Sequence, residues 1–289
     1  MVWTSSFAVS FDILFRYVEV YRDPTSERRT TMANPTDFET LLALADAADR
    51  ETLPLFRTVL GIDNKRPADF DPVTEADRAA ERAIREAIEA RFPAHAILGE
   101  EYGSTGTGDS RWVIDPVDGT RAFIAGVPVW GTLIGYCEAG RAVAGIMSQP
   151  FTGERFLAGF EGAELRRGET RTPLKTRETT RLTDAVLFTT TPRLYEGQAL
   201  KAFEQLEDTA RLTRFGVDCY AFAMLAAGHA DLVVETGLQP YDIVALIPII
   251  EAAGGVITTW QGGRAEDGGN VAAAATPELH ATALEILNG

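Results

Sequence analysis

The chain has 289 residues, of which 45% are hydrophobic and 24% are charged. This composition is ordinary for a globular protein and excludes collagen-like, coiled-coil and wholly disordered chains. The 42 acidic side chains outnumber the 27 lysines and arginines, which gives a net charge of −15 with neutral histidines. Because phosphate backbones repel such a surface, we expect no general binding to nucleic acids. The same carboxylates are potential ligands for metal ions.

The two cysteines, Cys137 and Cys219, lie far apart in the sequence and outside any CxxC pattern. A disulfide scaffold and a cysteine-rich zinc site are therefore not expected, and a reducing cytoplasm is the expected location. The apolar stretch at residues 3–21 is interrupted by three charged side chains, and no run reaches the roughly 18–20 apolar residues of a membrane span. We expect no membrane partner.

Residues 1–33 are expected to be a non-native or disordered extension. They lack the basic start of a secretory signal and lead through a polar linker to Met32, which is the expected biological start. After it, Thr36-Asp-Phe-Glu39 has the spacing of a capping box and precedes apolar residues at helical intervals. A first amphipathic helix is predicted from here.

A second helix is predicted from Thr74-Glu-Ala-Asp77 to Phe92, because a hydroxyl and an acid three residues later again have capping-box spacing. Beyond Pro93, short β-prone runs are separated by turns. Residues 34–180 are therefore expected to form an α+β half, with two helices on a largely antiparallel sheet. The predicted strands are Ala96–Leu98, Arg111–Ile114, Val129–Tyr136 and Val143–Met147.

After about Arg181 the predicted elements alternate between strands and helices, which is typical of an α/β half over residues 181–289. The boundary near Thr180 rests on this change of pattern and on the polar run that precedes it. The predicted strands are 185–188, 212–215, 232–234 and 256–258, and the predicted helices are 198–206, 220–227 and 243–253.

The densest polar motif is Trp112-Val-Ile-Asp115-Pro-Val-Asp118-Gly-Thr120, where an apolar strand ends in two acids, a glycine and a hydroxyl. Pro116 lacks an N–H and bends the chain, so Asp115 and Asp118 can converge on one point with the Val117 carbonyl turned toward it. Three oxygen donors of this kind suit one hard cation.

Gly119 and Thr120 follow at the start of an expected helix, where free backbone N–H groups suit a phosphate oxygen. The alternative for Asp115 and Asp118 is an Asp-Pro turn followed by a helix N-cap. An aspartyl-nucleophile phosphatase is another alternative, but its acids lie two residues apart, whereas these lie three apart with a proline between them. The spacing favours metal ligation.

Three further acids are candidate site residues. Glu100 follows the strand 96–98 and can bind a cation or take a proton from a water, the alternative being a solvated loop. Asp242 precedes the helix 243–253, and Asp77 lies in the second capping box. For both of these aspartates the alternative is a plain helix cap.

These residues resemble the inositol monophosphatase superfamily of magnesium-dependent, lithium-sensitive phosphomonoesterases. The likeness runs from about Thr36 to Asn288. It is carried by Asp71–Asp77, Gly99-Glu-Glu101, Trp112–Thr120, and Asp242 ahead of Ala252-Ala-Gly-Gly255. The resemblance implies an α/β fold in the form of a layered αβαβα sandwich, with two to three Mg²⁺ ions as cofactors. We also expect a homodimer.

The resemblance further implies roles for individual residues. Thr120 and Asp77 are implied as a pair that orients the attacking water, with Glu100 as a third catalytic residue, and the amides of Gly119 and Thr120 are implied on the phosphate. The implied metal ligands are all oxygen donors: Glu100, Asp115, the Val117 carbonyl, Asp118 and Asp242.

Within the superfamily, residues 128–134, 216–220 and 231–242 are most similar to histidinol-phosphate phosphatases. Histidinol carries a cationic amine and an imidazole, so a pocket selecting it should present carboxylates. Asp218 and Glu235 lie in segments that an α/β sheet brings to the metal end, the alternatives being a helix cap and a solvated strand end. The expected substrate contacts are Gly119, Thr120, Asp118, Asp218, Glu235 and Asp242.

The expected function is that of a Mg²⁺-dependent histidinol-phosphate phosphatase of histidine biosynthesis, acting on a small phosphorylated substrate. A metal-activated water would attack phosphorus in line, without a covalent intermediate. The alternatives are an inositol-1-phosphate phosphatase, a nucleotide 3′-phosphate phosphatase, and a non-catalytic ligand-binding protein on the same fold.

Overall fold

Helices α1 (Phe38–Thr52) and α2 (Glu75–Arg91) form the first layer in the computed structural model, which describes residues 34–59, 61–64 and 72–289. Apolar residues recur along each helix at intervals of three or four positions, so each helix has one buried face. These two faces pack against each other and against one sheet. A short antiparallel pair, β1 (Ile62–Asn64) and β2 (Pro72–Thr74), lies just before α2 in the sequence.

The start of α2 confirms the predicted capping box. The Thr74 hydroxyl accepts the Ala76 N–H at 3.1 Å, and Asp77 Oδ2 accepts the Thr74 N–H at 2.9 Å. Both bonds satisfy N–H groups that have no partner inside the helix.

The predicted capping box at Thr36 is wrong. Helix α1 begins at Phe38, and its N-cap residue Asp37 makes no side-chain cap hydrogen bond. Thr36 instead closes a turn, because its N–H and its hydroxyl both donate to Asn34 Oδ1. The Phe38 N–H finds its acceptor far away in the sequence, at Glu161 Oε2, 2.8 Å away.

An eight-stranded sheet forms the second layer, in the order β10-β9-β8-β7-β6-β5-β3-β4. Every neighbouring pair is antiparallel except β3 and β5, which confirms the largely antiparallel sheet. The strands are β3 (Ala96–Gly99), β4 (Gly103–Thr105), β5 (Ser110–Asp118), β6 (Gly131–Glu138), β7 (Arg141–Gln149), β8 (Glu154–Gly159), β9 (Gly162–Arg167) and β10 (Thr170–Pro173). The short helix α3 (Thr120–Ile124) follows β5.

A second sheet has five strands in the order β12-β11-β13-β15-β14. Strands β12, β11 and β13 are parallel, and β15 runs antiparallel to both of its neighbours. The strands are β11 (Val186–Thr189), β12 (Leu212–Phe215), β13 (Leu232–Leu238), β14 (Val256–Thr259) and β15 (Gly269–Ala274). The helices of this half are α4 (Gly197–Thr209), α5 (Cys219–Ala226), α6 (Pro240–Ile243), α7 (Leu246–Ala252) and α8 (Pro277–Asn288), with short 3₁₀ turns η1 (Leu182–Asp184) and η2 (Pro192–Leu194).

The predicted continuous helix 243–253 is wrong, because the structure divides it into α6 and α7. Pro248 has no N–H to donate to the Val244 carbonyl four residues earlier, and its ring crowds that carbonyl. The helix is therefore interrupted at Val244 and Ala245. The short α6 carries Asp242 in a segment of its own.

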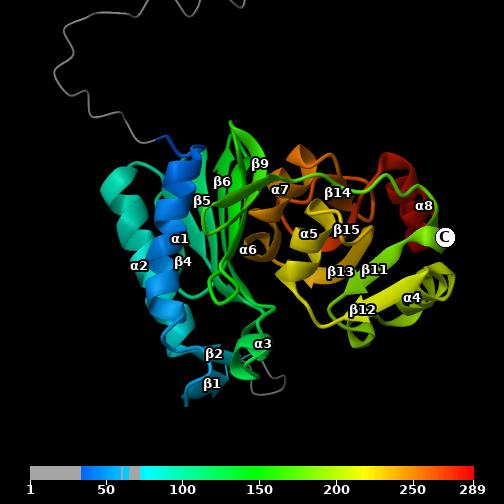
Figure 1. Cartoon of the computed structure of the whole chain (residues 1–289), viewed down its shortest axis with the longest axis horizontal. Helices are drawn as coiled ribbons and strands as arrows, with labels where there is room; N and C mark the ends of the chain where they lie inside the picture. The colour runs from blue at the N-terminus through cyan, green and yellow to red at the C-terminus, as the bar shows by residue number, and fades with distance from the viewer. Residues whose placement is uncertain (1–33, 60, 65–71) are drawn as a thin grey trace, which may run out of the picture. The chain divides into compact units, whose positions relative to one another are not determined.

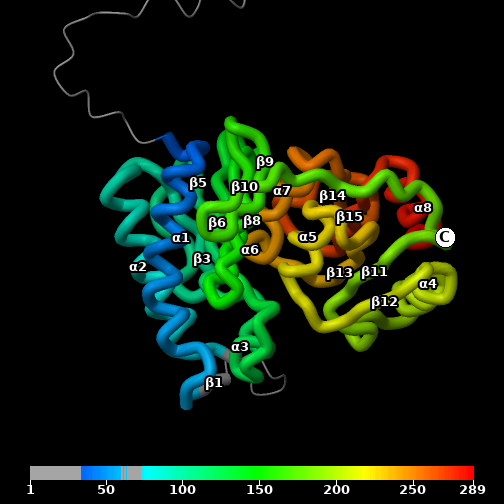
Figure 2. Tube along the Cα trace, in the orientation of Figure 1, coloured from blue at the N-terminus to red at the C-terminus, as the bar shows by residue number. Residues whose placement is uncertain are grey.

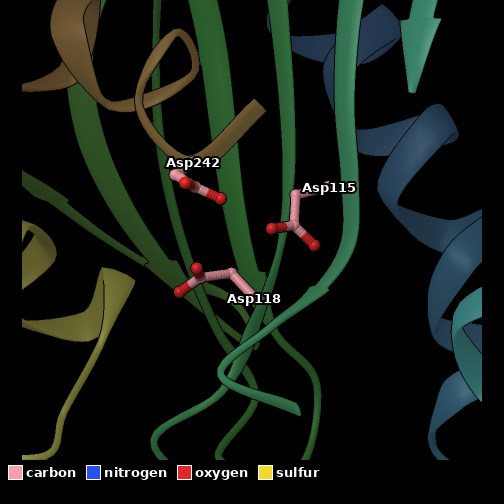
Figure 3. A group of neighbouring side chains, drawn as sticks. All are labelled: Asp115, Asp118 and Asp242. Atoms are coloured by element: carbon pink, nitrogen blue, oxygen red, sulfur yellow. The ribbon is translucent and has the colours of Figure 1, made fainter. Parts of the chain in front are cut away.

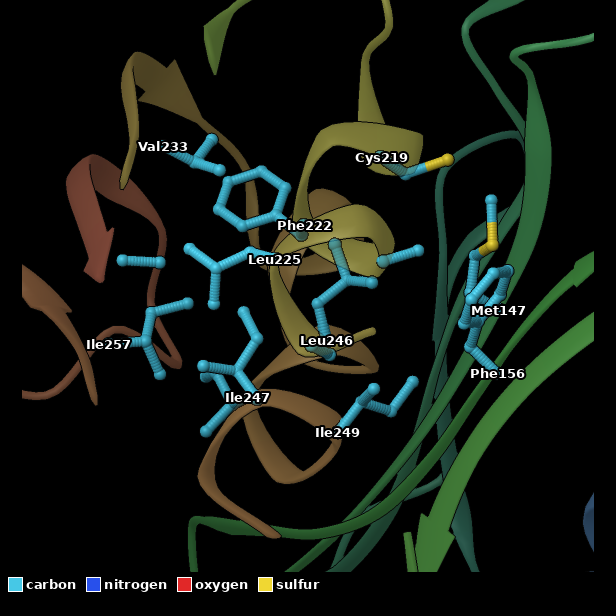
Figure 4. Close-up of a cluster of buried hydrophobic side chains, with 14 of the residues drawn as sticks. Met147, Phe156, Cys219, Phe222, Leu225, Val233, Leu246, Ile247, Ile249 and Ile257 are labelled. Carbon is cyan, nitrogen blue, oxygen red and sulfur yellow. The ribbon is translucent and has the colours of Figure 1, made fainter. Parts of the chain in front are cut away.

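The layers follow the predicted αβαβα order. Helices α1 and α2 cover one face of the eight-stranded sheet, helices α5, α6 and α7 lie between the two sheets, and α4 and α8 cover the far face of the five-stranded sheet (Figures 1 and 2). The central core joins both sheets through α5 and α7 (Figure 4). Its members include Met147 and Phe156 from the first sheet, Phe222, Leu225, Leu246 and Ile249 from the helices, and Val233 and Ile257 from the second sheet.

One sheet lies wholly before residue 180 and the other wholly after it. The division of the chain into halves at 34–180 and 181–289 remains a prediction, and the predicted extension 1–33 lies outside the described residues. Within the described part of the chain, none of the helices combines the length and the apolar character that crossing a bilayer requires.

Candidate active site

The end of strand β5 is irregular, and this irregularity positions the two acids of the densest motif. Asp115 pairs with Leu133 of β6, but the next pair is Asp118 with Gly131, so β5 carries one extra residue at this point. In a regular strand, side chains three residues apart point to opposite faces. The extra residue changes this alternation and allows Asp115 and Asp118 to face the same space.

Asp115, Asp118 and Asp242 come together at this place (Figure 3). Each offers a carboxylate oxygen, and the three oxygens lie within 4.8 Å of one another. Asp242 is not the N-cap residue of its helix: Gln239 is, and Asp242 Oδ2 accepts the Gln239 N–H at 2.7 Å. Thus the expected cap contact exists, but it leaves the second carboxylate oxygen for the cluster.

Burial and mutual repulsion make the charged form of these acids costly. Burial, followed by the charges of Glu100 and Asp118, raises the pKa of Asp115 well above its ordinary value. Burial and neighbouring acids likewise raise the pKa of Asp118, and they raise that of Asp242 to about 7. A bound cation would remove this penalty, and carboxylate oxygens are the ligands that Mg²⁺ prefers. The residues present therefore fit a magnesium site.

Glu100 lies beside the three-aspartate cluster. Its N–H donates to the Ile114 carbonyl at 3.1 Å, which ties the end of β3 to β5 immediately before Asp115. Its carboxylate raises the pKa of Asp115, Asp242 and Asp77, so it faces the site acids. The cluster of three mutually close oxygens does not include Glu100.

Asp77 and Thr120 lie within reach of each other. Asp77 Oδ2 is occupied by the helix cap, where it accepts from the Thr74 N–H and from the Thr74 hydroxyl at 2.6 Å. Asp77 Oδ1 lies 3.4 Å from the Thr120 hydroxyl, which can alternatively donate to the Val117 carbonyl at 3.1 Å. One carboxylate therefore caps α2 and also faces Thr120, so the cap and the pair do not exclude each other.

Gly119 turns the chain from β5 into α3 with a φ of 81°, in the left-handed region that favours glycine. A Cβ atom at this position would lie 3.0 Å from Asp218 Oδ2 and 3.2 Å from the Trp130 Cα. The turn thus brings the Gly119 and Thr120 backbone close to the second half of the chain. The expected contact of these two amides with a phosphate remains a prediction.

A cavity of about 180 Å³ adjoins the cluster. Four of its ten lining residues are acids and none is basic, so the cavity suits a cationic group. Asp218 and Glu235, the two predicted selectors, are both among the lining residues. The full lining consists of Asp118, Thr190, Leu194, Asp218, Cys219, Phe222, Glu235, Thr236, Leu238 and Asp242.

Glu235 is only 2% exposed, so the alternative of a solvated strand end is wrong. Its Oε1 accepts the Thr190 N–H at 2.6 Å and the Thr190 hydroxyl at 3.0 Å, and the Thr189 hydroxyl lies 3.4 Å from its Oε2. Burial raises the pKa of Glu235 to about 8. An ammonium group placed beside this carboxylate would lower that pKa again.

Asp218 precedes α5 but does not cap it through its side chain. Its φ of 44° is rare for a residue with a Cβ, and such strain is concentrated at functional sites. Asp118, from the other half of the chain, performs the capping instead: its Oδ2 accepts the Cys219 N–H at 2.7 Å. The start of α5 is therefore held on the three-aspartate cluster, which places Asp218 at the cavity.

The raised pKa of Glu235 predicts a pH-dependent stability. Between pH 4.5 and about pH 8 the folded chain keeps a proton on Glu235 that the unfolded chain has released. The contribution of protonated Glu235 to the stability of the fold is therefore complete below pH 4.5, declines as the pH rises and is lost above about pH 8.

In metal-free protein, Glu235→Gln should flatten the fall of the melting temperature across this range, as measured by differential scanning fluorimetry. The exposed Asp184→Asn should keep the wild-type slope. A variant slope equal to the wild-type slope would contradict this interpretation.

One charged pair beside the site, Glu81 and Arg85 of α2, was not predicted from the sequence. Glu81 is fully buried and Arg85 is 8% exposed. Together with Asp77 they lie at intervals of four residues, on the helix face that also carries Ile84. Charged residues on an otherwise apolar helix stripe are a signal that was available in the sequence.

Comparison with known proteins agrees with this geometry. The model of the inositol monophosphatase family matches residues 36–288. Bifunctional phosphatase IMPL2, chloroplastic, from Arabidopsis thaliana is 42% identical over 258 residues, which make up 85% of this chain and 73% of that protein. The histidinol-phosphatase of Streptomyces coelicolor is 37% identical over 256 residues, 85% of this chain and 94% of that protein.

Solved structures show the same fold. The structure of an inositol monophosphatase from Zymomonas mobilis superimposes with a TM-score of 0.77 at 39% sequence identity. The match covers 87% of this chain and 97% of that one. The layered sandwich and the positions of its elements are therefore shared along nearly the whole length of that protein.

Proposed function

Because this chain belongs to the inositol monophosphatase family, and is thus a phosphatase, we propose that it hydrolyses histidinol phosphate with Mg²⁺ held at the acidic cluster. The observation that carries the substrate assignment is the cavity beside that cluster, which has four acids and no basic residue in its lining. Histidinol phosphate has a cationic amine, whereas inositol phosphate has only hydroxyl groups beyond its phosphate. Relatives named histidinol-phosphatase, such as that of Streptomyces coelicolor, support the same substrate.

The proposed metal ligands are oxygen donors from three segments of the chain. They are Glu100, Asp115, the Val117 carbonyl, Asp118 and Asp242. Mg²⁺ bound there would lower the pKa of a water and neutralise charge on the phosphoryl and leaving oxygens. The expected two to three ions, the homodimer and the cytoplasmic location remain predictions from the sequence.

The remaining proposed roles belong to groups around the cluster. Asp77 and Thr120 orient the attacking water, and Asp77 Oδ1 is the oxygen free of the helix cap. The Gly119 and Thr120 amides hold a phosphoryl oxygen, at the start of α3. With these positions fixed, the attack requires orientation rather than a nucleophilic side chain.

The substrate amine is assigned to Asp218 and Glu235. Phe222, Leu194 and Leu238 give the same cavity an apolar wall, against which the flat imidazole can pack. A polyol would leave the two carboxylates without a cationic partner and would gain little from this apolar wall.

The test is a comparison of kcat/KM for histidinol phosphate, inositol 1-phosphate and adenosine 3′,5′-bisphosphate, using purified protein in Mg²⁺. Histidinol phosphate should be hydrolysed fastest. Asp218→Asn and Glu235→Gln should each raise its KM by about 30-fold or more, because losing one partner of a buried charge pair costs about 2 kcal/mol or more. Their effect on an uncharged phosphomonoester should be much smaller.

Asp184→Asn provides the control, since this acid is exposed and pairs with Arg181 away from the cavity. Faster hydrolysis of inositol 1-phosphate by the unmodified protein would replace the proposed substrate with that one. Equal KM effects on charged and uncharged substrates would remove Asp218 and Glu235 from the amine site.

A further inference from the structure

Glu81 and Arg85 form a buried ion pair that belongs neither to the proposed metal ligands nor to the lining of the acidic cavity. The Arg85 Nε lies 2.7 Å from Glu81 Oε1, and the Glu81 side chain is completely buried. Burying two charges is costly unless every polar atom finds a partner in good geometry. The hydrogen-bond partners of this pair therefore indicate its role.

Both oxygens of Glu81 accept N–H groups from the turn that follows β3. The Glu101 N–H donates to Oε2 at 2.7 Å, and the Tyr102 N–H donates to Oε1 at 3.2 Å. Arg85 continues along the same segment: it donates to the Gly103 carbonyl, and its Nη1 donates to the Thr105 hydroxyl at 3.0 Å. The pair thus binds the backbone of residues 101–103 at three successive positions and the side chain of Thr105.

Glu100 lies immediately before this hydrogen-bonded segment. On its N-terminal side, a Cβ on Gly99 would lie 1.9 Å from Glu81 Oε1, so the buried carboxylate occupies the space that any larger residue would need. The Glu100 N–H is fixed to the Ile114 carbonyl at 3.1 Å. The backbone around Glu100 is therefore bounded by Glu81 before and after it, and by β5 beside it.

We propose that the Glu81–Arg85 pair is a positioning element that orients the Glu100 carboxylate toward the three-aspartate cluster and thereby sets the affinity of the site for the metal. This inference rests on the proposed function, because it takes Glu100 to be a metal ligand. Groups that orient metal ligands from outside the coordination shell typically change metal affinity by about 10–100-fold when they are substituted. The pair itself touches neither substrate nor metal.

A purely structural role makes a different prediction. If the pair only stabilised α2 and the β3–β4 turn, its loss would lower the melting temperature while the folded molecules kept their affinity for metal. If it acts through Glu100, the affinity of folded protein falls, and the loss disappears in a background where Glu100 can no longer bind metal. Non-additivity of this kind identifies residues that act as one unit.

The experiment measures binding of Mn²⁺, which accepts the same oxygen ligands as Mg²⁺, by the paramagnetic resonance signal of the free ion. Four proteins are compared: wild type, Glu81→Gln, Glu100→Gln and the double variant. Glu81→Gln should weaken binding by about 10–100-fold. The double variant should bind as Glu100→Gln does alone. Saturating Mg²⁺ should restore kcat in Glu81→Gln, with the KM for substrate unchanged.

Glu75→Gln is the matched control. It makes the same change on the same helix, in a carboxylate that pairs with Arg82 at 2.8 Å but is 63% exposed. Its Mn²⁺ affinity should equal that of the wild type. Should Glu81→Gln fail to fold, Arg85→Lys takes its place, because it keeps the positive charge beside Glu81 and loses the guanidinium bonds to the turn.

The outcomes separate the two proposals. Wild-type affinity in folded Glu81→Gln or Arg85→Lys, or losses that add to that of Glu100→Gln, would overturn the positioning role and leave the metal site intact. Wild-type affinity in Glu100→Gln would overturn the ligand assignment of the proposed function, and the positioning role with it.

Discussion

Asp115→Asn should reduce Mg²⁺-dependent hydrolysis of phosphomonoesters by more than about 100-fold in kcat/KM. Asp115 shares the close cluster with Asp118 and Asp242, and Glu100 lies beside it. Substituting a group that merely orients a metal ligand costs about 10–100-fold, so replacing a proposed ligand at the centre of the site should cost more. The measurement is steady-state kinetics over a series of Mg²⁺ concentrations, with chelator-treated protein as the metal-free reference.

The same variant should keep its stability without metal. Burial and neighbouring acids disfavour the charge of Asp115, and asparagine carries no charge. Mg²⁺ should raise the melting temperature of the wild type, because a ligand of the native state stabilises that state, but it should not raise that of Asp115→Asn. Full activity of the chelated wild type, or an unchanged Mg²⁺ response of the variant, would show that the cluster is not the metal site.

Asp231→Asn is the matched control for this experiment. Asp231 is also a fully buried aspartate, but it lies outside the cluster, where its Oδ2 accepts the Val186 N–H at 2.8 Å and pairs with Arg177 at 3.1 Å. Its substitution should lower the melting temperature through the weakened pair. The Mg²⁺ response and kcat should stay at wild-type values.

The parts of the fold that the sequence predicted are those with a local physical cause. The Thr74 capping box and the strand runs of the first sheet needed only neighbours in the sequence to be recognised. Thr36 had the same spacing as Thr74, but its own N–H donates to Asn34, and the first N–H of α1, that of Phe38, donates to Glu161. A local pattern cannot show that a residue 123 positions away, in the turn between β8 and β9, supplies the acceptor.

The elements that were not predicted depend on tertiary contacts or on weaker local signals. Strand β15 contains three alanines, which have low β-propensity, and it becomes a strand because it pairs with β13 and β14. Helix α8 did have a local signal, since Thr276 accepts the Leu279 N–H and Pro277 occupies the first helical position.

The candidate site divides in the same way. The motif at residues 112–120 indicated that Asp115 and Asp118 converge, although the extra residue in β5 that brings this about is visible only in the pairing with β6. That Asp118 caps α5 depends on two segments 101 residues apart in the sequence. Asp71, which belongs to one of the motifs that carry the family resemblance, lies outside the described residues.

Asp77→Asn should lower kcat by about 10²–10⁴-fold, the range typical of losing a group that handles the proton of a reacting water. The fold should tolerate the change. The asparagine carbonyl oxygen can replace Asp77 Oδ2 as acceptor of the Thr74 N–H, so the helix cap remains. The substituted amide group then faces Thr120 in place of Oδ1, and it can neither accept the Thr120 hydroxyl proton nor carry negative charge toward the attacking water.

The decisive comparison is with Thr74→Ala, which removes a capping hydroxyl that accepts the Ala76 N–H. That variant should lose about 1 kcal/mol of stability and retain far more turnover than Asp77→Asn. If Asp77 acts on the water, catalysis requires the charge of its carboxylate and not the helix cap. Thr74→Ala should then be the less stable variant in thermal unfolding, and Asp77→Asn should have the lower kcat. Near-normal turnover in Asp77→Asn, with a stability loss matching that of Thr74→Ala, would reduce Asp77 to a helix cap and remove it and Thr120 as a catalytic pair.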